Sequence, residues 1–109
     1  PRRVINEVRA KERLQELAKI QTGAPLSCEK AVARLHSQMD TMLEVSQKNF
    51  RDGFVTAADY EPKAAKIRET KTKVSVSDCE SAVGVKKDFY TCMSHSSNHL
   101  FGCALKHRY

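Results

Sequence analysis

The chain has 109 residues and a formal net charge of +6, with 29% charged and 40% hydrophobic residues. It contains no tryptophan and only 6% aromatic residues, so it forms at most one domain with a small core. The composition is too apolar for a disordered chain. It favours elongated amphipathic helices that pack against a partner. No run of eighteen apolar residues is present, so we expect no membrane span.

The first predicted element is a basic amphipathic helix over residues 3–21. Val4, Val8 and Leu14 recur at helical spacing, and Gly23 ends the pattern. Acidic residues are interleaved with the basic ones, which favours mature protein over a cleavable mitochondrial presequence. A solvated helix face is the simplest interpretation of the charge, and contact with nucleic acid or anionic lipid is the alternative.

A second helix is predicted to begin after Ser27, whose side chain suits an N-cap. Apolar and small residues then alternate by four and three, as in a short coiled-coil stripe, and the turn formers Asp52 and Gly53 end the helix. Methionines at this spacing are typical of a core. Such a stripe packs against another helix, so we expect four of its residues to bind a partner: Val32, Leu35, Met39 and Met42.

A third helix is predicted over residues 62–71, because Pro62 is tolerated in a first helical turn but not deep inside a helix. Residues 70–77 alternate polar and β-branched side chains, yet no second strand candidate exists, so they are predicted to form an extended linker. These elements define a first region, residues 1–73, which is predicted to be an extended helical partner-binding region.

The second region, residues 74–109, is predicted to be a helical hairpin. Ser77 and Glu80 match a capping box and precede a helix over residues 78–93. Residues 94–98 are rich in turn formers, and a short helix follows from Leu100. The predicted fold class is therefore all-α, with elongated amphipathic helices followed by a disulfide-clamped C-terminal hairpin.

The four cysteines restrict how that hairpin is closed. On one intact helix Cys79 and Cys92 would lie about 20 Å apart, which is too far for a disulfide. Cys92 and Cys103 flank the polar turn, so two helices folded side by side would bring them together. Cys28 and Cys79 are left to form a second bridge or to stay as buried thiols, and the sequence leaves both open.

A zinc site competes with the disulfide interpretation in the same tail. Cys92, His95, His99 and Cys103 follow one another at spacings of three and four residues, and zinc accepts such ligands in tetrahedral geometry. No paired carboxylates, Gly-rich loop or oxyanion donor accompanies them, so we expect no enzyme activity and no cofactor.

The tail also resembles a known family. Cys92 and Cys103 are separated by ten residues, an aromatic residue precedes the first cysteine, a histidine lies in the turn, and Leu100 precedes the second cysteine. This pattern is similar to the centre of a coiled-coil-helix-coiled-coil-helix (CHCH) domain, in particular in subunits of the mitochondrial contact site and cristae organising system. Two antiparallel helices in that family each carry Cys-x9-Cys and share an inner and an outer disulfide. Ala82 occupies the outer position here, so the resemblance implies a hairpin held by its inner bridge alone.

The resemblance implies a non-catalytic accessory subunit of a mitochondrial inner-membrane assembly: a respiratory-chain complex, the ATP synthase or the cristae-organising complex. It implies import by oxidative folding into the intermembrane space, packing against protein subunits, and a position peripheral to the membrane. The alternatives are a secreted small disulfide-containing helical protein and a basic nucleic-acid-binding module.

Overall fold

A computed structural model describes residues 19–107, and the helix predicted over residues 3–21 lies outside the described residues except for its last three, which are not helical. The described part of the chain contains five helices and no strand, which confirms the all-α prediction. It is elongated, with principal extents of 47 × 28 × 19 Å. Within residues 19–107, no helix combines the length and the apolar character that crossing a membrane requires.

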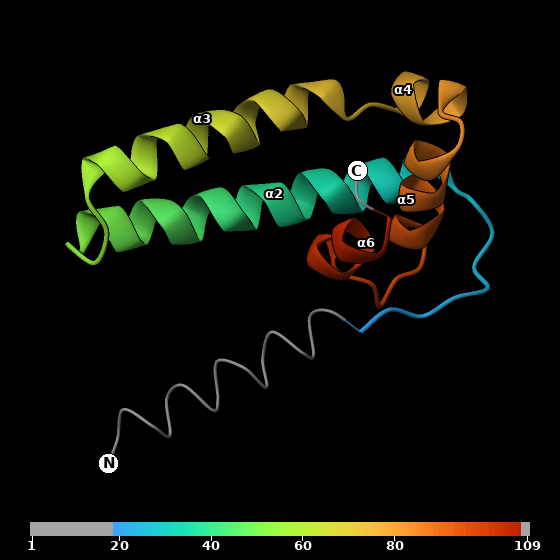
Figure 1. The fold of residues 1–109 in the computed structure, drawn as a ribbon, viewed down its shortest axis with the longest axis horizontal. Helices are drawn as coiled ribbons and strands as arrows, with labels where there is room; N and C mark the ends of the chain where they lie inside the picture. The colour runs from blue at the N-terminus through green and yellow to red at the C-terminus, as the bar shows by residue number, and fades with distance from the viewer. Residues whose placement is uncertain (1–18, 108–109) are drawn as a thin grey trace, which may run out of the picture.

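The two longest helices, α2 (Cys28–Arg51) and α3 (Ala57–Lys73), run antiparallel and form the long axis of the molecule (Figure 1). The predicted cap is confirmed, because the Ser27 hydroxyl accepts a hydrogen bond from the Lys30 amide at 3.4 Å. The predicted turn is confirmed as well, since α2 ends at its C-cap Asp52 and Gly53 has a φ of 80°. Only glycine adopts that conformation without strain.

Helix α3 begins one and a half turns before the predicted start at Pro62, so the predicted boundary is wrong. The Thr56 hydroxyl accepts from the Asp59 amide and caps the helix there. Tyr60 is buried and stacks on Phe50 of α2 with ring centroids 4.8 Å apart. Aromatic stacking and burial hold the first turn in place, although Pro62 lacks the amide that a helix interior uses.

The extended linker predicted over residues 70–77 is mostly helical. Helix α3 continues to Lys73, and the hydroxyls of Thr70 and Thr72 donate to carbonyl oxygens of the preceding turn. Only Val74 and Ser75 are extended. Val74 is 2% exposed, so this short connection is part of the core rather than a free linker.

The helix predicted over residues 78–93 consists of two helices, α4 (Val76–Ser81) and α5 (Val85–Met93). The predicted Ser77 cap is wrong, because α4 is capped by Ser75, whose hydroxyl accepts from the Asp78 amide at 3.0 Å. Between the helices Gly84 adopts a φ of 63° and turns the chain. Figure 1 shows α5 folded down across the start of α2 as a result.

The last helix, α6 (Leu100–Lys106), agrees with the predicted short helix after the polar turn. One hydrophobic core joins the helices on both sides of the predicted boundary at residue 73, so the two predicted regions pack as one unit. Its buried residues are Ala31, Val32, Leu35, Met39, Val74, Cys79, Ala82, Phe89, Tyr90, Cys92, Met93 and Cys103.

Candidate functional site

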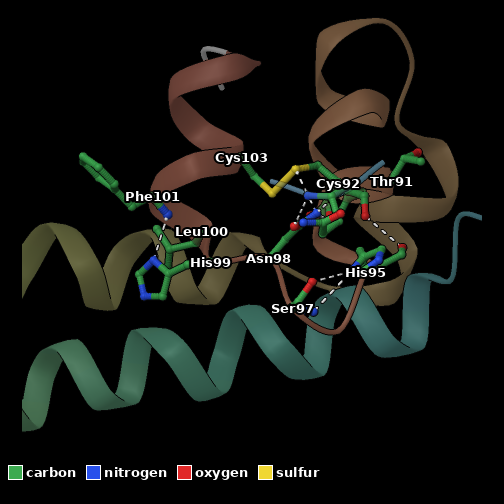
Figure 2. The surroundings of a disulfide bond; sticks show 12 residues. Thr91, Cys92, His95, Ser97, Asn98, His99, Leu100, Phe101 and Cys103 are labelled. Atoms are coloured by element: carbon green, nitrogen blue, oxygen red, sulfur yellow. Dashed lines mark hydrogen bonds between the residues drawn. A yellow bond between two sulfur atoms is a disulfide. The ribbon is translucent and has the colours of Figure 1, made fainter. Parts of the chain in front are cut away.

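The C-terminal tail is closed by a disulfide between Cys92 and Cys103, as predicted (Figure 2). It joins the last turn of α5 to the middle of α6, with a Cα–Cα distance of 5.8 Å, within the usual range for bridged cysteines. Cys103 is fully buried and Cys92 nearly so. The clamped hairpin is therefore packed against the core rather than projecting from it.

A second disulfide joins Cys28 at the start of α2 to Cys79 in α4, with a Cα–Cα distance of 5.6 Å. The sequence left these two cysteines open between a bridge and buried thiols, and the structure shows the bridge. It connects residues separated by 51 positions. With all four cysteines paired, the chain has no free thiol.

Asn98 fixes the turn between α5 and α6, and its role was missed at the sequence level. Its side chain is 1% exposed; the amide Nδ2 donates to the carbonyl oxygens of Cys92 and Gln21, and Oδ1 accepts from the Gln21 amide. Its own carbonyl oxygen accepts from the side chains of Arg34 and Gln38 on α2. One buried residue thus ties the N-terminal segment, α2 and the hairpin together.

The zinc alternative is wrong for the set Cys92, His95, His99 and Cys103. Both sulfur atoms are bonded to each other, so neither is available as a thiolate ligand. The Nδ1 atom of His95 accepts from the Ser97 amide, and that of His99 accepts from the Phe101 amide. Nowhere in residues 19–107 do three or more histidine, cysteine or acidic side chains gather in a metal-binding arrangement.

The predicted partner-binding stripe faces the interior of the chain. Val32, Leu35 and Met39 are at most 7% exposed and belong to the core, so the prediction that they bind a partner is wrong. The stripe does pack against helices, but these are the other helices of the same chain. Met42 is half-buried and lines an apolar cleft of about 200 Å³ beside Leu100.

A second polar cluster holds α4 against α5. The Asp78 carboxylate accepts a hydrogen bond from the Tyr90 hydroxyl at 2.6 Å and pairs with the Lys86 ammonium group. Burial alone would raise the pKa of Asp78, but the hydrogen bonds from Lys86 and Tyr90, with the charge of Lys86, lower it overall. The cluster spans the Gly84 corner and fixes the angle between the two helices.

The histidines of the tail are in two different environments. His99 caps α6, and burial followed by the positive charge of Arg34 lowers the pKa of its imidazole. His95 and His107 line a shallow cleft of about 160 Å³ together with Asp88 and Lys106. Among the described residues, no hydrogen bond or ion pair joins these four side chains to one another.

Comparisons with protein-family models, curated proteins and solved structures found no match. The CHCH resemblance therefore stays a prediction that rests on the inner bridge. Ala82, at the position of the outer cysteine of that family, lies between α4 and α5, and the second bridge of this chain joins α2 to α4 instead.

Proposed function

We propose that this chain is a non-catalytic helical protein that folds in an oxidising compartment and binds another macromolecule there. The observation that carries the proposal is that all four cysteines are paired in two disulfides. Disulfides persist in secreted proteins and in oxidising compartments, and they are rare where thiols are kept reduced.

The two bridges also suit a small core. In the chain-entropy model, a loop of 11 residues contributes about 3 kcal/mol. The loop of 51 residues contributes about 4 kcal/mol in the same model. Both are large beside the net stability of a typical domain, so the fold depends on the redox state of its compartment.

The first candidate is the accessory subunit implied by the CHCH resemblance, on the intermembrane-space side of the mitochondrial inner membrane. A subunit needs a surface for its neighbours, and apolar side chains are exposed at both ends of the molecule. Val83 and Val85 flank the Gly84 corner at 79% and 53% exposure, and Phe54 is 78% exposed beside the α2–α3 turn. Exposed apolar groups of this kind suit helix packing against a partner.

The second candidate is a secreted helical protein, and one observation favours it. The stripe on α2 is covered by the helices of the same chain, so no partner is required to bury it. The disulfide between Cys28 and Cys79 also joins α4 to the start of α2, which helps to keep the stripe buried. Both features are expected of a protein that remains folded by itself.

Localisation of the full-length protein, combined with peptide mapping without reductant, tests the proposal. We expect the pairs Cys28–Cys79 and Cys92–Cys103 in protein taken directly from cells with its thiols blocked. Protection from protease until the outer mitochondrial membrane is opened would support the first candidate, and recovery from the medium would support the second. A reduced protein in the cytosol, with four alkylated cysteines, would overturn both.

A further inference from the structure

A cleft of about 360 Å³, here called the basic cleft, opens between the segment before α2, the first two turns of α2 and the turn after α5. The polar residues that line it are Ser27, Lys30, Arg34, Ser94, His95 and Ser96. The lining contains two cationic side chains, several hydroxyl groups, one histidine and no acidic side chain. The basic cleft is therefore electropositive and rich in hydrogen-bond donors.

The two cations lack counter-charges within the described residues. Lys30 and Arg34 lie one turn apart on α2, whereas Lys71, Lys73 and Lys86 are each paired with a carboxylate. Neither Lys30 nor Arg34 forms an ion pair with any described acidic group. The positive charge of these two side chains is therefore available to bind an anionic ligand in the basic cleft.

Arg34 has donor capacity that the protein does not use. One terminal nitrogen donates to the Asn98 carbonyl oxygen, while the buried Nε atom has no hydrogen-bond partner among the described residues. A guanidinium group carries five N–H donors in a planar fork that fits phosphate oxygens. The contact with Asn98 fixes one side of the fork and leaves other donors unused.

The orientation of His95 adds a further donor. Its Nδ1 atom accepts from the Ser97 amide at 3.2 Å, and an amide can only donate, so the neutral ring carries its proton on Nε2. The Ser97 hydroxyl contacts the same Nδ1 atom at 2.8 Å and leaves Nε2 unused. His95 can therefore donate to a ligand without becoming charged.

The walls of the basic cleft are held in place before any ligand binds. The Ser94 hydroxyl accepts from the Ser27 amide at 2.9 Å and donates to the Tyr90 carbonyl oxygen. The Cys28–Cys79 bridge fixes the start of α2, and Asn98 holds the neighbouring turn. A preformed site loses little conformational entropy when a ligand binds. Little of the electrostatic attraction to the ligand is therefore offset by that loss.

We propose that the basic cleft binds a single phosphate group, with Lys30 and Arg34 as its charge partners and His95 and Ser27 as further donors. The size of the cleft suits one phosphate with a small substituent, and no phenylalanine, tyrosine or tryptophan side chain lines it to stack a base. The positive end of the α2 dipole lies at the same place and adds to the attraction. The group comes either from a soluble phosphate ester or from a phospholipid headgroup.

Titration of the full chain with three probes distinguishes these sources: inorganic phosphate, glycerol 3-phosphate, and phosphatidylcholine vesicles with or without phosphatidic acid. Calorimetry and amide chemical shifts at constant ionic strength give the affinity and the place of binding. We expect shifts centred on Ser27, Lys30 and Ser96. Binding of the soluble probes identifies a soluble ester, and binding of the phosphatidic acid vesicles alone identifies a headgroup.

Lys30→Gln is the decisive variant, because the Lys30 side chain has no partner within residues 19–107 whose loss would disturb the fold. We expect it to weaken binding about tenfold, the effect of losing one charge-assisted hydrogen bond. Lys48→Gln is the matched control, since Lys48 lies on the same helix about 27 Å away and should leave the affinity unchanged. Arg34→Gln should weaken binding similarly, with its fold checked by thermal unfolding.

Three outcomes would overturn the proposal. One is the absence of saturable binding to any of the three probes. The second is equal loss of affinity in Lys30→Gln and Lys48→Gln, which indicates attraction to the overall charge of the chain. The third is binding of anionic vesicles that Lys30→Gln leaves unchanged, which places the contact elsewhere on the chain.

Discussion

Asn98 donates from Nδ2 to the carbonyl oxygen of Cys92 at 2.8 Å, beside the disulfide that clamps the hairpin. The same amide nitrogen also reaches the Gln21 carbonyl oxygen at 2.9 Å. A covalent bridge and a buried polar side chain therefore constrain the same turn. The bridge fixes the distance between α5 and α6, while Asn98 fixes the turn against the N-terminal segment and α2.

Replacing Asn98 with alanine should destabilise the protein by about 3 kcal/mol, because buried carbonyl and amide groups lose their partners. Asn98→Asp should be comparably destabilising, since a carboxylate has nearly the same shape but no Nδ2 donor. Urea unfolding measures both changes. Asn49→Ala is the control, because the side chain of Asn49 makes no hydrogen bond to any residue of the range 19–107. Equal effects at the two positions would contradict the role assigned to Asn98.

The two disulfides should differ in their contribution to stability. Alanine replacement of both Cys28 and Cys79 should cost about 4 kcal/mol, against about 3 kcal/mol for Cys92 and Cys103, because the first pair closes the longer loop. The sequence separations are 51 and 11 residues. Midpoints of urea unfolding rank the two double variants. The reverse order would show that packing at the bridges outweighs the loop entropy of the unfolded chain.

Local signals in the sequence were sufficient for several parts of the fold. The Ser27 cap, the turn at Asp52 and Gly53, and the bridge between Cys92 and Cys103 were all predicted and are confirmed. Each depends on residues close together in the chain, so spacing and residue type carry the information. The corner at Gly84 was missed because apolar residues continue at helical spacing on both sides of it.

Contacts between residues far apart in the chain determine the features that the sequence did not predict. Ser75 and Ser77 are each followed three residues later by an acidic residue, so both match the local pattern of a helix cap. In the structure Ser75 is the cap, and Val74 and Cys79 are buried in the core. Leu35 was predicted to meet a partner, yet it is fully buried within the chain. Asn98 looked like an ordinary turn residue. Nothing local distinguishes an intramolecular contact from an intermolecular one in these cases.

The contact between Asp78 and Tyr90 should stabilise the protein at neutral pH and lose its effect in acid. The pKa of Asp78 is lowered in the folded state, so its charged form contributes stability above the usual carboxyl range. That contribution is lost as the pH falls through the folded pKa. A double-mutant cycle with Asp78→Asn and Tyr90→Phe should give a coupling of about 1 kcal/mol near neutrality, reduced for partial exposure.

The same cycle repeated in acid provides the check. Once Asp78 is protonated, the charge-assisted hydrogen bond from Tyr90 is weakened, so the coupling should become smaller. The contribution of Asp78 to the α4 dipole is the same with Tyr90 or phenylalanine and cancels in the cycle. A coupling that does not change with pH would show that the two side chains interact through packing alone.

His99 reports on the positive charge of Arg34 next to the basic cleft. The pKa of His99 is lowered from its usual value of 6.5, first by burial and then by Arg34. Because the folded state favours the neutral ring, His99 contributes stability above the usual histidine pKa, and that stability is lost as the pH falls through the folded pKa. Titration of the His99 ring protons by NMR should give a midpoint below that of an unfolded peptide.

Arg34→Gln should move this midpoint back toward the usual value without restoring it fully, because burial remains. Lys30→Gln is the matched control, since Lys30 is not among the causes of the His99 shift. If the basic cleft binds phosphate on Arg34, added phosphate should raise the His99 midpoint in the native chain and have little effect in Arg34→Gln. An unchanged midpoint in Arg34→Gln would mean that burial alone lowers the pKa of His99.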